Sequence, residues 1–117
     1  MPKLNRRPRC YVAGPYTKPD PCINTNRAIY IANRLWYLGF APYVPHLTHL
    51  WNTVTPKPYI FWLEYDAEFI PVMDCVYRFD GESTGADREV KQAISLGIPI
   101  FHTIEAMCEH FELTPDH

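Results

Sequence analysis

Hydrophobic positions along the chain fall into two patterns, short continuous runs and longer segments with helical spacing. Short runs bounded by Gly or Pro are typical of buried strands. They lie at residues 9–13, 40–45, 72–77 and 98–101. Segments with apolar residues three or four positions apart are typical of amphipathic helices. They lie at residues 24–38, 58–70, 86–96 and 103–111. The sequence therefore predicts strands and helices in strict alternation.

Capping and helix-breaking residues set the predicted boundaries. Asn24 is a suitable N-cap for the first helix, and Gly39 ends it. Pro58 suits the first turn of the second helix, and residues 46–57 before it are expected to form a loop. Thr103 caps the last helix.

Alternating strands and helices predict an α/β fold, a Rossmann- or flavodoxin-like three-layer sandwich with a parallel sheet of four to five strands. Residues 9–117 are expected to form one domain behind a flexible leader of residues 1–8. Ligands of such sheets bind beyond the carboxyl ends of the strands. We therefore expect the site in the loops that begin at Gly14, Pro45 and Asp80.

The charge balance narrows the class of partner. The 117 residues include 11 basic and 13 acidic side chains, so no overall field favours a nucleic acid polymer or an anionic membrane. The one basic cluster lies in the leader, where it either contacts phosphates or forms a solvated tail. It consists of Lys3, Arg6, Arg7 and Arg9.

Cofactors, metals and secretion have no support in the sequence. The four cysteines lack zinc-ligand spacing, and buried free thiols indicate a reducing compartment, the cytoplasm. No apolar stretch of about 18 residues is present to span a membrane. A GxGxxG motif and a P-loop are both missing, so no cofactor is expected.

The segment from Gly81 to Glu89 carries the best candidate chemistry. Thr84 and Asp87 have capping-box spacing, and the free N–H groups at such a helix start form an anion site. Glu89 follows one turn later and is expected to stay ionised there. An ionised carboxylate beside a sugar anomeric carbon acts as a nucleophile. The alternative is that Glu89 is one of the many first-turn acids with no chemistry.

Other polar residues leave alternatives open. Asp74 interrupts the third apolar run: it either faces the same crevice as Glu89 or caps a neighbouring loop. His46 and His49 lack a third ligand for a metal, so we favour a single His lining a pocket. The nearby aromatic residues either stack on a base or pack the helix of segment 58–70 onto the sheet or against another subunit. They are Trp51, Tyr59, Phe61, Trp62 and Tyr65, and for the last three we favour packing.

An ordered set of short motifs between residues 10 and 101 resembles the nucleoside 2-deoxyribosyltransferase family and its relatives, the deoxynucleoside-monophosphate N-glycosidases. The set is Tyr11-x-Ala13-Gly14-Pro15, Val44-Pro45-His46, Asp74, Ser83-x-Gly85-Ala86-x-x-Glu89, and Ala93, Gly97, Pro99 and Ile100. The resemblance implies that Glu89 is a nucleophile forming a glycosyl-enzyme intermediate, that Asp74 assists the leaving base, and that Tyr11 orients Glu89 or the sugar. The substrate-binding residues it implies are Gly14, Pro15, His46, Ser83, Gly85 and Ala86.

Ser83 suggests which substrate to expect. It lies six residues before Glu89, where nucleoside-specific members of the family tend to have an acid and monophosphate-specific members a Ser. A hydroxyl beside a helix N-terminus accommodates a phosphate that a carboxylate would repel. We therefore expect a hydrolase or transferase acting on a deoxynucleoside 5′-monophosphate, or a deoxynucleoside. Relatives assemble, so a homodimer or higher homo-oligomer is expected. The competing hypotheses are a non-catalytic nucleotide-binding or sensing module and a bare interaction domain.

Overall fold

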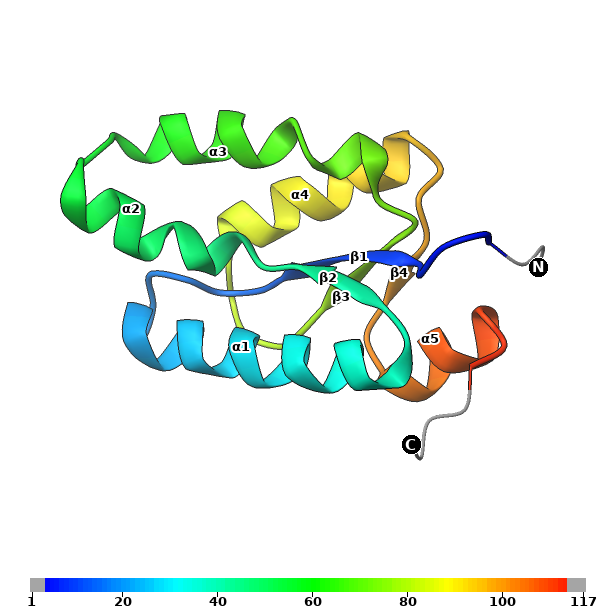
Figure 1. Cartoon of the computed structure of the whole chain (residues 1–117). Helices are drawn as coiled ribbons and strands as arrows, with labels where there is room; N and C mark the ends of the chain where they lie inside the picture. Colours follow the sequence, from blue (N-terminus) through cyan, green and yellow to red (C-terminus); the bar gives the residue numbers. More distant parts are fainter. Residues whose placement is uncertain (1–3, 114–117) are drawn as a thin grey trace.

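The computed structural model describes residues 4–113 and shows a parallel sheet between two layers of helices (Figure 1). Its strands are β1 (Arg9–Ala13), β2 (Ala41–Tyr43), β3 (Cys75–Arg78) and β4 (Ile100–Phe101). Their order in the sheet is β2-β1-β3-β4, with every pair parallel. One face is covered by α1 (Pro21–Leu38) and α5 (Ile104–His110), whereas α2 (Thr48–Val54), α3 (Tyr59–Ala67) and α4 (Thr84–Ser95) lie on the other side. The predicted α/β three-layer architecture is confirmed, with four strands in the described residues.

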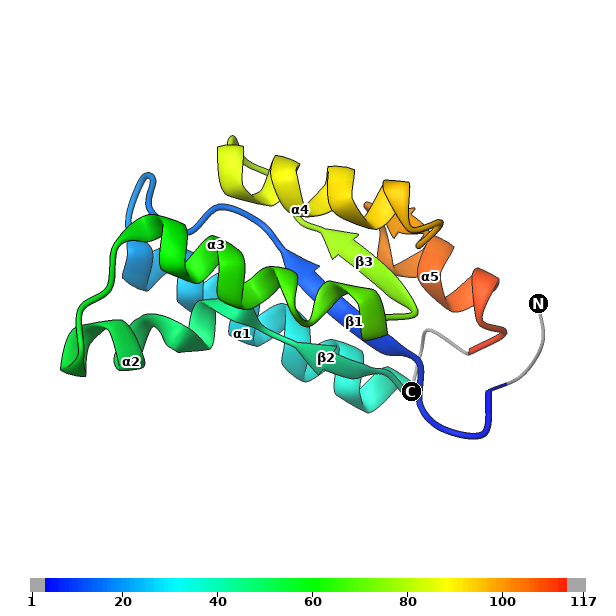
Figure 2. The same cartoon turned by 90° about the horizontal axis from the view of Figure 1, so that it is seen from above.

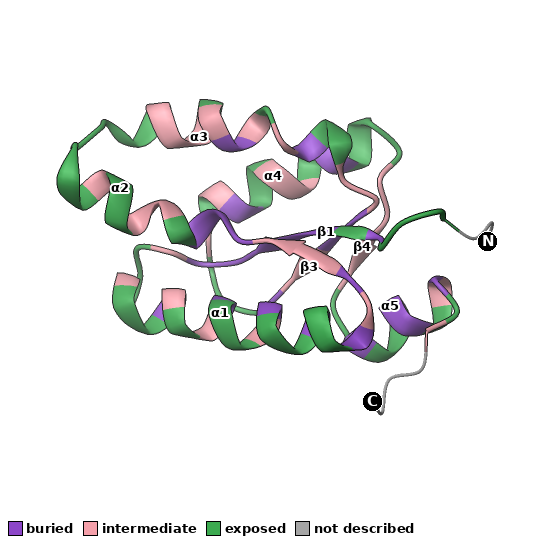
Figure 3. Cartoon of the chain, in the orientation of Figure 1, coloured by how far each residue is buried: buried purple, intermediate pink, exposed green. Residues whose placement is uncertain are grey.

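The central strand β1 separates two apolar cores. Consecutive side chains of a strand point to opposite faces, so Cys10 and Val12 join the core beneath α1 and α5. Tyr11 and Ala13 join the core on the α4 side. All four are fully buried between the helical layers (Figure 3). This alternation is what directs the Tyr11 side chain towards α4.

The first helix begins earlier than predicted. Its N-cap is Asp20, whose carboxylate accepts hydrogen bonds from the backbone N–H groups of Cys22 and Ile23 at 2.8 and 3.1 Å. Pro21 then suits the first helical position. Asn24 is not the cap: it is fully buried, and its amide donates to the carbonyls of Tyr16 and Lys18, both at 2.9 Å. Asn24 therefore holds the loop that follows β1.

The prediction of a loop over residues 46–57 was wrong, because a short 3-10 helix, η1 (Pro45–Leu47), and α2 occupy this segment. No residue of α2 is buried and no side chain caps its start, so the segment lacks a capping signal in the sequence. Residues of α3 pack against Trp51 of α2, with ring centroids of Phe61, Trp62 and Tyr65 at 6.2, 5.0 and 5.2 Å. These aromatic residues join α2 to α3.

Segment ends also differ from the predictions. Helix α3 ends at Ala67, and a second 3-10 helix, η2 (Ile70–Val72), precedes β3. Strand β3 consequently begins at Cys75 rather than at Val72. Helix α4 begins at Thr84, two residues before its predicted start. Viewed from above the sheet, α3 and α4 lie next to each other over the strands (Figure 2).

The described part of the leader is bound to the domain. Arg6 forms an ion pair with Asp74 at 2.5 Å, and Arg7 donates to the carbonyls of Trp36 and Phe40 at 2.6 and 3.0 Å. The interpretation as a solvated tail is therefore wrong for these two arginines. Lys3 lies outside the described residues. Between residues 4 and 113, no helix has both the length and the apolar character needed to cross a membrane.

Candidate active site

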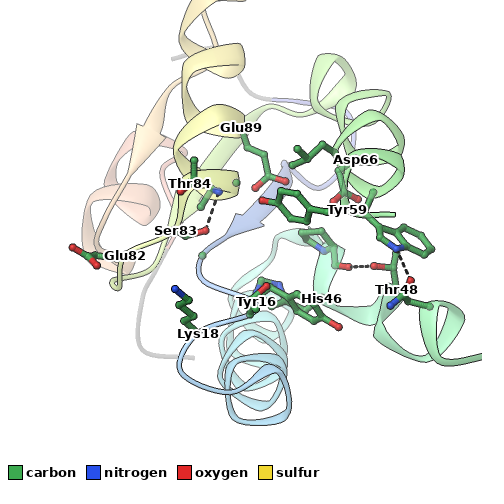
Figure 4. Close-up of a pocket in the computed structure, with 18 residues that line it drawn as sticks. Tyr16, Lys18, His46, Thr48, Tyr59, Asp66, Glu82, Ser83, Thr84 and Glu89 are labelled. Atoms are coloured by element: carbon green, nitrogen blue, oxygen red, sulfur yellow. Dashed lines mark hydrogen bonds between the residues drawn. The ribbon is translucent and has the colours of Figure 1, made fainter. Parts of the chain in front are cut away.

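A cavity of about 760 Å³ lies beyond the carboxyl ends of β1, β2 and β3 (Figure 4). This is the position expected for a ligand site in a parallel sheet. Its walls come from the loop after β1, from η1 and α2, from α3, and from the start of α4. The lining residues used below are Gly14, Tyr16, Lys18, His46, Thr48, Asn52, Tyr59, Trp62, Asp66, Ser83, Thr84, Gly85, Ala86 and Glu89.

Glu89 lines this cavity and is held by Tyr11, which is fully buried and is not itself a lining residue. Glu89 lies in the second turn of α4, and its Oε2 accepts a hydrogen bond from the Tyr11 hydroxyl at 2.5 Å. Burial raises the pKa of Glu89 to about 7, although the Tyr11 hydrogen bond and the charge of Arg78 both lower it. Burial therefore outweighs the hydrogen bond and the positive charge, and it opposes the expectation that Glu89 stays fully ionised at neutral pH.

Asp66 is a second buried carboxyl of the cavity, whose lining also includes the exposed Glu82. It lies on α3, is only 7% exposed, and its Oδ1 has no hydrogen-bond partner among the described residues. Burial and the nearby charge of Glu89 raise its pKa to about 8. Asp66 is thus mostly protonated at neutral pH, which suits a proton donor.

Asp66 is a cavity residue that was not predicted from the sequence. A signal was present, because Tyr59, Trp62, Leu63 and Asp66 have the spacing of one helical face. An acid on such an apolar face is costly unless it has a function or a partner.

Asp74 does not enter the cavity. It directly precedes β3 at the amino end of the sheet, where its Oδ2 accepts from the guanidinium of Arg6 at 2.5 Å and from the backbone N–H of Arg9 at 2.7 Å. Partial burial raises the pKa of Asp74, but these hydrogen bonds and positive charges lower it more. Of the two interpretations left open by the sequence, the structural one fits: Asp74 fastens the leader. The proposed approach of Asp74 to Glu89 is wrong.

The start of α4 differs in one detail from its prediction. Ser83, not Thr84, is the N-cap, and its Oγ accepts a hydrogen bond from the backbone N–H of Ala86 at 3.0 Å. Both hydroxyl residues still line the cavity. A Cβ at Gly85 would lie 2.5 Å from the Tyr59 hydroxyl, so a larger residue there would require the Tyr59 side chain to shift. The close approach of Tyr59 narrows the cavity at this point.

Gly14 and His46 line the cavity, whereas Pro15 does not. Gly14 is needed for packing as well, since a Cβ would lie 2.1 Å from the ring of Phe79. The Nε2–H group of His46 donates to the Pro15 carbonyl at 2.9 Å, and burial lowers the pKa of His46, so its ring is neutral. Pro15 therefore contributes a backbone acceptor that orients His46 rather than a contact surface.

Arg78 stabilises the loop between β3 and α4. It lies at the end of β3 and donates to the carbonyls of Phe79 and Gly81, the latter at 2.7 Å. It also lies 3.5 Å from the carboxylate of Asp87 in the first turn of α4. The guanidinium therefore fixes the loop that leads to Ser83, and its positive charge lowers the pKa of Glu89.

The architecture places the protein among flavodoxin-like α/β folds whose ligand cavity lies at the carboxyl edge of a parallel sheet. No protein-family model matches the sequence, and no curated protein sequence matches it. The fold is nevertheless similar to a solved structure, that of the 2-deoxyribosyltransferase of the psychrotolerant bacterium Bacillus psychrosaccharolyticus, a biocatalyst for the synthesis of antiviral and antitumoral nucleosides. The TM-score is 0.55 with 19% identity, over 82% of this chain and 75% of that chain. At this identity the similarity concerns the fold.

Proposed function

We propose that this protein cleaves or transfers the N-glycosidic bond of a 2′-deoxynucleoside 5′-monophosphate, or of a deoxynucleoside. One observation carries the proposal: Glu89, held by Tyr11, shares a cavity with a second buried carboxyl, Asp66, whose pKa is higher. Most glycosidases cleave the glycosidic bond with two carboxyl groups that differ in proton affinity. The fold of a 2-deoxyribosyltransferase supports the same class of reaction.

In the proposed reaction, the carboxylate of Glu89 attacks C1′ and forms an ester with it. The C1′–N bond breaks, and its electron pair stays on the nitrogen of the leaving base, which receives the proton of Asp66. Water or a second base then attacks C1′ and releases Glu89, while Asp66 takes the proton lost by the attacking group. Tyr11 holds the attacking carboxylate in place through its hydrogen bond.

The start of α4 is proposed to bind the 5′-phosphate. Ser83, Thr84 and Gly85 line the cavity there, and a helix N-terminus attracts anions. Lys18, from the loop after β1, lines the same end of the cavity with its amino group on the side of Ser83 (Figure 4). A positive charge and a hydroxyl-rich helix start both favour phosphate over a free 5′-hydroxyl.

A substrate panel tests the proposal. Deoxynucleosides and their monophosphates are incubated with the protein, and release of free base is measured with Glu89→Gln as the inactive control. We expect release from monophosphates that Glu89→Gln abolishes. Tight nucleotide binding without release from any substrate would instead indicate a nucleotide sensor. Release that survives Glu89→Gln would contradict the nucleophile. Formation of a new nucleotide, or of a new nucleoside from a deoxynucleoside substrate, after addition of a second base would identify a transferase.

We further propose that the protein forms a homo-oligomer through α2. The outer side of η1 and α2 exposes Leu47, Leu50 and Val54 at 59, 69 and 72%, and no Asp, Glu, Lys or Arg occurs between Arg34 and Lys57. An uncharged apolar stripe suits contact with a second copy of itself. The cysteines are free thiols, in keeping with a proposed cytoplasmic location.

A further inference from the structure

Asn52 is a polar residue of the cavity wall that the proposed reaction does not use. It lies on α2, four residues after Thr48, and both line the cavity. Residues four apart share one face of a helix, so this face of α2 turns towards the cavity while Leu50 and Val54 lie on the exposed stripe.

The orientation of the Asn52 amide is fixed by two donors. Its Oδ1 accepts from the backbone N–H of Lys57 at 2.9 Å and from the indole Nε1–H of Trp62 at 2.8 Å. Neither group can accept a hydrogen bond. Turning the amide over would set its NH₂ group against two N–H groups, so the hydrogen-bond network decides the assignment of oxygen and nitrogen.

The amide nitrogen is consequently the end left to interact with a ligand. It donates to no side chain or carbonyl within residues 4–113, and it is not among the polar atoms that are buried without a partner. The amide nitrogen therefore keeps some exposed surface and both of its N–H donors, and Asn52 lines the cavity. Asn52 can donate to a ligand here but cannot accept from one.

The position of Asn52 relative to Asp66 also suits contact with the base. Trp62, which it contacts, precedes Asp66 by four residues on α3, a rise of about 6 Å along the helix. A base that receives a proton from Asp66 beside its glycosidic bond extends away from that bond by about one ring. Its outer edge would then face the wall formed by Trp62 and Asn52.

We propose that Asn52 determines base specificity by donating a hydrogen bond to a carbonyl oxygen on the outer edge of the base. This inference rests on the proposed function. It assigns the substrates to the oxo bases: uracil or thymine with O4, and hypoxanthine or guanine with O6. Cytosine and adenine carry an amino group at the same positions, so they would bring two sets of donors together without an acceptor.

The test compares matched substrates that differ in this group. Values of kcat/KM are measured for dUMP against dCMP and for dIMP against dAMP. We expect the oxo member of each pair to be favoured about tenfold or more, because the amino member leaves buried N–H donors without an acceptor. Equal rates within both pairs, or faster reaction of the amino members, would overturn the role of Asn52 while leaving the glycosidic reaction intact.

The variant Asn52→Asp sharpens the test. One carboxylate oxygen still accepts from Lys57 and Trp62, while the other replaces the NH₂ group with an acceptor. The preference within both pairs should reverse towards dCMP and dAMP. A purely structural role would lower all four rates by the same factor. Asn33→Asp, an exposed position on α1, is the control for the added charge and should keep the original preference.

Binding measurements separate this inference from the proposed function. Calorimetry with the four monophosphates and the Glu89→Gln protein needs no turnover, and it also serves if Asn52→Asp does not fold. Tighter binding of dUMP and dIMP without turnover by the native protein would contradict the enzyme but support Asn52. Equal binding of all four nucleotides would contradict Asn52.

Discussion

The Tyr11 hydroxyl donates a 2.5 Å hydrogen bond to Oε2 of Glu89, joining the central strand to the second turn of α4. Tyr11 is fully buried, and both burial and the charge of Glu89 raise its pKa. The phenol therefore keeps its proton and remains a donor across the working pH range. This contact fixes the proposed nucleophile at one place and favours its ionised form.

Replacing Tyr11 with Phe should impair the nucleophile more than the fold. The hydrogen bond from Tyr11 lowers the pKa of Glu89, so its loss should raise that pKa and move the acidic limb of kcat/KM to higher pH. A loss of about tenfold to a hundredfold at pH 7 is expected from the combined loss of ionisation and orientation. Tyr37→Phe, at an exposed position, serves as the control. An unshifted acidic limb would argue against the contact.

The pH dependence of kcat/KM should be bell-shaped. Activity requires Glu89 ionised and Asp66 protonated, so it should fall below pH of about 7 and again above about 8. In Asp66→Asn the alkaline limb should disappear and the remaining rate should be low for bases that need protonation. Rates across pH 5–10, with Glu64→Gln on the exposed side of α3 as control, measure this. An alkaline limb retained in Asp66→Asn would remove Asp66 from the role.

Asp66 should also reduce stability at alkaline pH. Its pKa is raised from 3.8 to about 8 on folding, so between these values the folded protein binds more protons than the unfolded one, and stability falls as pH rises. The stability that protonated Asp66 contributes is fully present below a pH of about 4 and is lost as the pH rises through about 8. Asp66→Asn should therefore increase the free energy of unfolding at pH 8.5 by about 2–4 kcal/mol. Denaturant unfolding at pH 5 and 8.5 tests the difference, which Glu64→Gln should not show.

Arg78 should act on the reaction through Glu89 and the loop before Ser83. Its charge lowers the pKa of Glu89, so Arg78→Met should raise that pKa and shift the acidic limb upwards. Loss of the hydrogen bond to Gly81 should also weaken monophosphate binding and raise KM severalfold. Arg78→Lys should restore the pH profile but only part of the KM, because one ammonium does not reproduce the geometry of a guanidinium. Equal pH profiles in both variants would contradict the electrostatic role.

The exposed stripe of α2 predicts a specific effect on assembly. Leu50→Glu would place two like charges at the centre of a symmetric contact, so the native oligomer should dissociate into monomers. Light scattering after size-exclusion chromatography measures the mass. Ile94→Glu, on an exposed part of α4, should leave assembly unchanged. A monomeric native protein, or an oligomer unaffected by Leu50→Glu, would show that this stripe is not the contact.

Local sequence patterns were sufficient for the order of elements, because apolar periodicity and caps act over a few residues. They identified β1 within its observed bounds and the parallel alternation that puts the site at the carboxyl edge of the sheet. They also singled out Glu89 and its helix start. They failed for α2, which is short, has no side-chain cap at its start and leaves its apolar residues Leu50, Trp51 and Val54 exposed.

The sequence by itself determined the α/β class, the loop carrying Ser83, and Glu89 as the candidate acid. Only the tertiary structure decided which second carboxyl accompanies Glu89. Asp74 and Asp66 both interrupt apolar stretches of the sequence, but Asp74 lies at the amino end of β3 with Arg6, whereas Asp66 lies in the cavity. Their pKa values move in opposite directions for that reason. Burial and charge partners depend on chain segments far apart in sequence, so no local pattern could separate the two.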